Sequence, residues 1–110
     1  MCKRLKGMRS MYDHLVFFKF NDSLTPVREK ELIEELKAFK EIIPGIVELT
    51  VGINVTEEKE KVQGYTLGLR VTFKDKDALD KYGPNTAHQK FVKSLEGIIE
   101  DIIVVDYPLS

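Results

Sequence analysis

Two histidines, His14 and His88, are the residues of this chain whose type suits acid–base chemistry near neutral pH. His88 follows a Gly83-Pro84 break and opens a new helical stretch. The positive end of the helix dipole disfavours a charged imidazole there, so we expect His88 to be neutral at pH 7, as a general base requires. Tyr82 lies six positions earlier, which is about 120° away on an unbroken helix. The two side chains can therefore meet only if the break redirects the chain.

These side chains also have structural interpretations. His88 can bond a backbone carbonyl and seat its helix on the sheet, and Tyr82 can be a core tyrosine with its hydroxyl at the surface. His14 shares an apolar strand face with Val16 and Phe18, where a hydrogen-bonded core histidine is more common than a catalytic one. If that face lines a cavity, the cavity is a mostly apolar small-molecule site. Its predicted lining comprises His14, Val16, Phe18, Val47, Leu49, Leu67, Leu69 and Phe91.

Composition excludes several classes of protein. With 110 residues, 43% of them hydrophobic and 32% charged, the chain is typical of one soluble globular domain. A net charge of −1 argues against nucleic-acid binding. No apolar run approaches the roughly 20 residues of a membrane span. The single cysteine, Cys2, excludes an intramolecular disulfide and favours a cytoplasmic location.

Other kinds of chemistry have no visible anchor in the sequence. Two separate histidines fall short of a zinc ligand set, so we expect no metal. There is no phosphate-binding glycine loop and no serine in a nucleophile motif. We therefore expect no cofactor.

Hydrophobic periodicity predicts four strands and the helices between them. Residues 1–11 are predicted to be a flexible tail and residues 12–110 the domain. Thr25 and Pro26 begin the first helix, and Pro44-Gly45 ends it. Thr86 is predicted to cap the last helix, with Gln89 as its capping-box partner. The predicted strands span residues 12–20, 46–55, 64–73 and 102–107, and a short helix spans residues 77–82.

The order β-α-β-β-α-β predicts an α+β, ferredoxin-like domain with a four-stranded antiparallel sheet and helices on one face. The first strand is apolar on both faces, because Leu15 and Phe17 lie opposite Val16 and Phe18. Something must cover the second face, and a second copy of the chain is the simplest candidate. Two sheets packed face to face about a twofold axis would form a dimeric α/β barrel.

The whole pattern resembles the stress-responsive A/B barrel domain family. The order and spacing of the matching segments carry the resemblance more than any single segment does. The matching segments are His14-Leu15-Val16-Phe17-Phe18-Lys19-Phe20, Ile43-Pro44-Gly45-Ile46, Gly64-Tyr65-Thr66, Ala87-His88-Gln89-Lys90-Phe91 and Val104-Val105-Asp106-Tyr107.

The resemblance implies a homodimer, sometimes assembled further, with a pocket between sheet and helices. In a polyketide-cyclising enzyme of the family, a tyrosine and a histidine that match Tyr82 and His88 do the chemistry without a cofactor. A pocket histidine of that enzyme matches His14. Two other histidines are replaced here, by Leu67 and Asn85, which argues against the same substrate.

Three functions remain open at this point. The first is a homodimer with a mostly apolar small-molecule pocket and an unknown physiological role. The second is a cofactor-free enzyme that uses His88 and Tyr82 in enolate or aldol chemistry, as a cyclase or lyase does. The third is a structural or stress-protective oligomer without a ligand.

Overall fold

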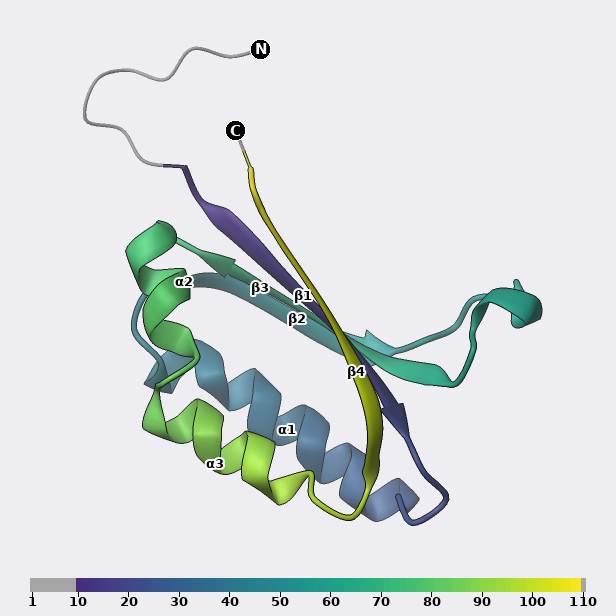
Figure 1. Ribbon diagram of the computed structural model, residues 1–110. Helices are drawn as coiled ribbons and strands as arrows, with labels where there is room; N and C mark the ends of the chain where they lie inside the picture. The colour runs from purple at the N-terminus through teal and green to yellow at the C-terminus, as the bar shows by residue number, and fades with distance from the viewer. Residues whose placement is uncertain (1–9, 110) are drawn as a thin grey trace.

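The computed structural model describes residues 10–109, which form a four-stranded antiparallel sheet with helices on one face (Figure 1). The strand order is β2-β3-β1-β4. This confirms the predicted α+β, ferredoxin-like class. Residues 1–9 of the predicted tail, with Cys2, lie outside the described residues. In chain order the elements are β1 (Tyr12–Phe20), α1 (Pro26–Ile42), β2 (Ile46–Ile53), the 3-10 turn η1 (Lys59–Lys61), β3 (Tyr65–Phe73), α2 (Lys76–Tyr82), α3 (Thr86–Ser94) and β4 (Ile99–Pro108).

Helix α1 begins and ends where the sequence predicts. The Thr25 side chain accepts a hydrogen bond from the Arg28 amide, and Pro26 takes the first helical position. Beyond the last turn, Gly45 has φ +87° and lies against Ala78 of α2, where an added Cβ would come within 2.5 Å of the Ala78 Cβ. A glycine is therefore needed here both for the backbone conformation and for the packing of α2.

The register of β1 with its neighbours separates the two faces of the sheet. His14, Val16 and Phe18 pair with Val71, Leu69 and Leu67 of β3, so all six point toward the helices. On β4 their partners are Asp106, Val104 and Ile102. The opposite face carries Phe17, Ile103 and Val105, which remain partly exposed in the single chain. The predicted division of β1 into two apolar faces is thus present in the structure.

Strand β2 departs from its predicted single apolar face. Ile46 pairs with Phe73 and Glu48 with the next residue of β3, Thr72. Val47 is therefore an extra residue of β2 without a partner on β3, which is a β-bulge. This bulge leaves Val47 46% exposed and buries Ile46 instead. The strand also ends at Ile53, two residues before the predicted end.

Both predicted helices after β3 are present as α2 and α3, but the N-cap residue of α3 differs from the prediction. Asn85, not Thr86, is the N-cap of α3, and its side chain accepts hydrogen bonds from the amides of Ala87 and His88. Asparagine is the stronger N-cap residue, and Thr86 takes the first helical position. His88 therefore lies at the third position of α3, one residue later than predicted.

The helices cover the sheet unevenly. Helix α1 packs against β2 (Figure 1), whereas β4 is exposed along nearly its whole length. Ile102 and Val104 point to the helical side of the sheet and still remain 37% and 51% exposed. The space between β4 and α3 is therefore not filled by side chains.

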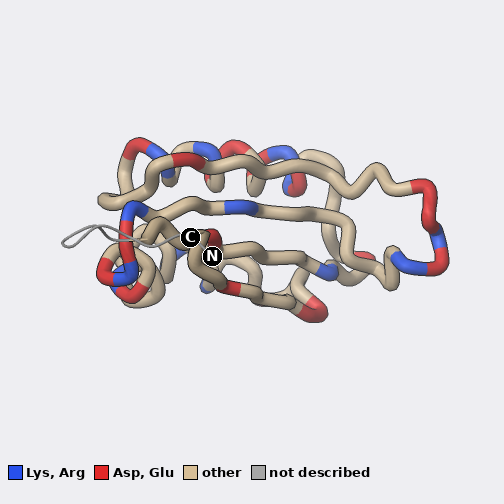
Figure 2. The backbone as a smooth tube through the Cα atoms, turned by 90° about the horizontal axis from the view of Figure 1, so that it is seen from above, with Lys and Arg blue, Asp and Glu red and all other residues tan. Residues whose placement is uncertain are grey.

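Charged residues follow the helices and the 56–63 connection, whereas the strands carry few of them (Figure 2). Within residues 10–109, no helix is long and apolar enough to span a membrane.

Candidate functional site

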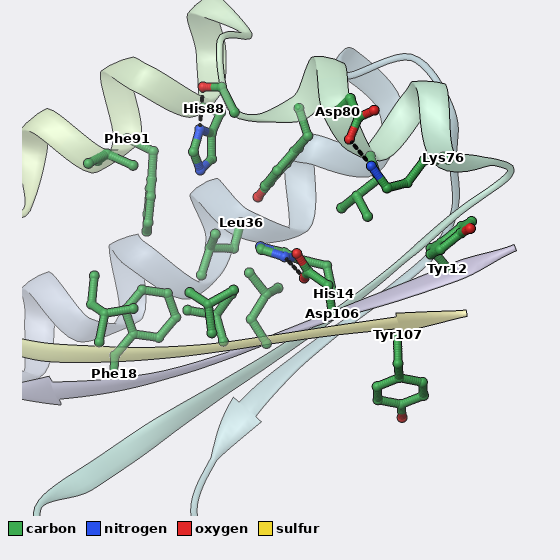
Figure 3. A pocket seen from close by; sticks show the side chains of 18 of the residues that line it. Tyr12, His14, Phe18, Leu36, Lys76, Asp80, His88, Phe91, Asp106 and Tyr107 are labelled. Carbon is green, nitrogen blue, oxygen red and sulfur yellow. Dashed lines mark hydrogen bonds and ion pairs between the residues drawn. The ribbon is translucent and has the colours of Figure 1, made fainter. Parts of the chain in front are cut away.

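A cavity of about 520 Å³ lies between the β1–β4 half of the sheet and the helices α2 and α3 (Figure 3). Its walls are mostly apolar and aromatic, with a few polar groups. These features are typical of a small-molecule site. The apolar and aromatic lining includes Tyr12, Val16, Phe18, Leu36, Leu69, Leu79, Phe91, Val92, Leu95, Ile102 and Val104.

His88 lies at the wall of the cavity formed by α3. Its ring is held by the segment between α2 and α3. Its Nδ1 lies 3.0 Å from the carbonyl oxygen of Gly83. A carbonyl can only accept, so Nδ1 carries the proton and donates it. In the neutral ring the lone pair is then on Nε2, which points into the cavity (Figure 3).

The protonation state of His88 is set mainly by burial. Burial lowers the pKa of His88, the hydrogen bond to the Gly83 carbonyl raises it, and the neighbouring charge of His14 lowers it. The net direction is downward, so the neutral form predominates at pH 7. This agrees with the predicted neutral state, although burial rather than the helix dipole is the main cause.

Tyr82 ends α2 and lies between the two histidines. Its ring centroid is 4.3 Å from that of His88 and 5.2 Å from that of His14. The Gly83-Pro84 segment allows this approach, as the sequence required. Tyr82 is only 4% exposed, and burial raises the pKa of Tyr82 well above its usual range. The phenol therefore stays protonated at neutral pH and can donate a hydrogen bond.

His14 forms a hydrogen-bonded pair with a residue that the sequence did not reveal as functional. Its Nδ1 lies 2.6 Å from Oδ1 of Asp106 on the adjacent strand β4. Because the carboxylate accepts, Nδ1 donates, and Nε2 of a neutral His14 is left with the lone pair. Both histidines thus have Nδ1 engaged and Nε2 without a hydrogen-bond partner among residues 10–109.

An ion pair on α2 lies at the other end of the cavity from Phe91 (Figure 3). Lys76 Nζ is 2.6 Å from Asp80 Oδ1, and Asp80 raises the pKa of Lys76. Both side chains line the cavity. Lys76 is therefore already neutralised by a neighbour one turn away.

The structure brings seven of the ten predicted site residues to this cavity. Val47, Leu49 and Leu67 do not line it. Val47 is displaced by the bulge, Leu49 lies on β2, against which α1 packs, and Leu67 is fully buried in the core. The seven that do line it are Tyr82, His88, His14, Val16, Phe18, Leu69 and Phe91.

The cavity residues that the sequence did not single out come mainly from β4 and α2. Ile102, Val104 and Asp106 alternate along β4, and this alternation was the available signal. It could not be used without the pairing of β4 with β1, which places Asp106 beside His14.

The polar groups can support proton transfer and hydrogen bonding to an oxygen atom. Nε2 of neutral His88 can accept a proton, and the Tyr82 phenol can donate a hydrogen bond. Within the described part of the chain, no three His, Cys, Asp or Glu side chains cluster closely enough to hold a metal ion.

Fold and cavity together define a ferredoxin-like α+β domain with a ligand-sized space between sheet and helices. The model of the stress responsive A/B barrel domain matches residues 13–109. The chain therefore belongs to the stress responsive A/B barrel domain family.

Similar proteins include enzymes and a protein of unknown function. Olivetolic acid cyclase from Cannabis sativa is 30% identical over 94 residues, which cover 86% of this chain and 92% of the cyclase. A dimeric ferredoxin-like protein of unknown function from Jannaschia sp. CCS1 has a TM-score of 0.74 at 31% identity, covering 88% of this chain and 97% of that one. Hydroxynitrile lyase from Passiflora edulis has a TM-score of 0.81 at 20% identity, covering 92% and 94%, and shows similarity of fold alone.

Proposed function

We propose that this protein binds a mostly apolar small molecule carrying at least one polar oxygen. The cavity of about 520 Å³ is the observation that carries the proposal. A space of this size inside a domain would normally be filled by side chains, yet Phe18 and Phe91 line an open space here. The polar groups beside that space are few and convergent, as in sites that orient a ligand by one or two hydrogen bonds.

A cavity-filling variant tests the proposal. Val104 lines the cavity and is 51% exposed, so Val104→Trp can fill the space without disturbing the buried core. Val55 lies two residues after the end of β2, is 88% exposed and does not line the cavity, so Val55→Trp is the matched control. A panel of medium-chain ketones and phenols is screened by thermal shift and then by calorimetry. Ligands should stabilise the wild type and Val55→Trp but not Val104→Trp; equal stabilisation of all three proteins would exclude this cavity as the site.

A second candidate function is cofactor-free proton transfer on a carbonyl compound. The specific observation in its favour is the position of Tyr82 between two histidines whose Nε2 atoms have no hydrogen-bond partner in the described part of the chain. Nε2 of His88 would take a proton from the carbon next to the carbonyl. The electron pair of the broken C–H bond would move onto the carbonyl oxygen, where the Tyr82 hydroxyl would donate a hydrogen bond. The relation to olivetolic acid cyclase supports chemistry of this kind.

Exchange of hydrogen for deuterium at the carbon next to the carbonyl of a medium-chain ketone, followed by NMR, tests this candidate. We expect His88→Ala to slow exchange by about 10²- to 10⁴-fold, because it removes the general base. Tyr82→Phe removes the hydrogen-bond donor and should slow exchange by a smaller factor. Lys40→Ala, an exposed substitution on α1, is the control. If the wild type binds the ketone without catalysing exchange, the enzyme candidate fails while the binding function stands.

The protein is also proposed to be a homodimer. The dimeric relative from Jannaschia sp. CCS1 supports this assembly, as does the exposed apolar face that carries Phe17. A protein without ligand binding or turnover would fit the third possibility, a structural or stress-protective oligomer. The cytoplasmic location inferred from the single cysteine stays a prediction.

A further inference from the structure

A shallow groove along α3 borders the cavity. Gly83, His88 and Val92 line both spaces, so the groove adjoins the cavity at His88. The groove is otherwise polar and open to solvent. Its remaining lining residues are Thr86, Gln89, Lys90, Lys93 and Glu96.

Helix α3 differs in charge from the other two helices. Its nine residues include Lys90 and Lys93 and no acidic residue. Neither lysine forms an ion pair with a carboxylate among residues 10–109. On α2, by contrast, both lysines pair with an aspartate one turn away. The groove therefore presents two uncompensated cations, with Glu96 as the single carboxylate among its lining residues.

The opposite end of the cavity offers no unpaired lysine or arginine among its lining residues. Asp106 and Asp80 both line it, and the one cation there, Lys76, is occupied by Asp80. Asp106 is held by His14 and remains part-exposed. An anionic group at that end would meet carboxylates that already have partners and no unpaired lysine, whereas at the α3 end it would meet two lysines. The charges thus favour one orientation of a charged ligand.

We propose that the ligand is an amphipathic anion whose apolar body occupies the cavity and whose negatively charged end lies on Lys90 and Lys93. This inference rests on the proposed binding function and names the class of ligand. The proposal also fixes the orientation of the ligand. Its charged end lies outside the cavity beyond His88, and its apolar end points toward α2. A carboxylate or a phosphate ester at the end of an apolar chain would satisfy the site.

Decanoate and decanol, which share a chain and differ in charge, are the test probes. Calorimetry with the wild type should show decanoate binding about fivefold more tightly than decanol, the size expected of two exposed ion pairs. The preference should shrink at high salt. In Lys90→Gln/Lys93→Gln the preference should disappear while decanol binding stays unchanged.

A matched control removes the same charge elsewhere. Lys30 and Lys40 are on α1, line neither the cavity nor the groove, and are replaced in Lys30→Gln/Lys40→Gln. This variant should keep the wild-type preference. If decanol binds but decanoate has no advantage, or if both double variants lose the advantage equally, the anion proposal is overturned and the binding function survives. If neither probe binds, both proposals are overturned.

Discussion

At the residue scale, the two histidines have the same arrangement but different partners. Each has its Nδ1 hydrogen-bonded and its Nε2 without a partner among residues 10–109, yet His88 donates to a backbone carbonyl and His14 to a carboxylate. The structural and functional interpretations of His88 are therefore compatible. The hydrogen bond to Gly83 that fixes the helix start also selects the tautomer that a base needs.

The lowered pKa of His88 predicts a specific pH dependence of stability. The unfolded chain binds a proton on this ring near pH 6.5, and the folded chain binds it only at lower pH. The free energy of unfolding should therefore be highest above pH 6.5, fall as the pH drops toward the folded pKa, and level off below it. NMR titration should place the His88 midpoint below 6.5, and His88→Asn should remove this part of the dependence. A midpoint at or above 6.5 would contradict the burial argument.

At the element scale, the cap of α3 is the point at which the sequence prediction and the structure diverge most clearly. Replacing Asn85 by alanine removes the acceptor for two amides and should cost about 1 kcal/mol of folding free energy. Thr86→Ala changes a residue at the first helical position and should cost less than about 0.5 kcal/mol. Urea denaturation of both variants measures the difference. A larger loss for Thr86→Ala would restore the predicted capping box.

The turn between α1 and β2 provides a second test at this scale. Gly45 and Gly97 both have φ near +90°, so alanine is strained at either position by about 1–2 kcal/mol. Only at Gly45 would the new Cβ also meet Ala78. Gly45→Ala should therefore destabilise the protein by about 1–3 kcal/mol more than Gly97→Ala, as overpacking does. Equal losses of unfolding free energy would show that α2 can shift away at little cost.

Local signals were enough to predict the elements and part of the cavity lining, but not the residues that β4 adds to that lining. Thr25, Pro26 and Gly45 act on their nearest neighbours, so the ends of α1 could be located from the sequence. The Val47 bulge depends on how β2 pairs with β3, which no local pattern reveals. Asp106 became a site residue only through the register of β4 against β1. His14 and His88 were found because their residue type alone suggests acid–base chemistry.

At the scale of the whole molecule, the sheet is covered on one face only. The helices and the cavity occupy one side, and the other carries partly exposed apolar side chains of β1 and β4. Strands with exposed apolar faces and an uncovered edge associate with other chains unless something covers them. A second copy would bury this face and complete the barrel expected for the fold.

A charge on the exposed sheet face should separate the subunits. Phe17 lies on that face between Gly68 and Ile103 of the neighbouring strands and is 38% exposed. In Phe17→Lys, two ammonium groups related by the twofold axis would be buried near each other, which costs several kcal/mol. Light scattering at micromolar concentration should give twice the chain mass of 12.7 kDa for the wild type and the single-chain mass for the variant. Val55→Lys, an equally drastic change outside the sheet, should remain dimeric. If Phe17→Lys remains folded and dimeric, the subunits must meet through another surface, and the open face would then be available to a different partner.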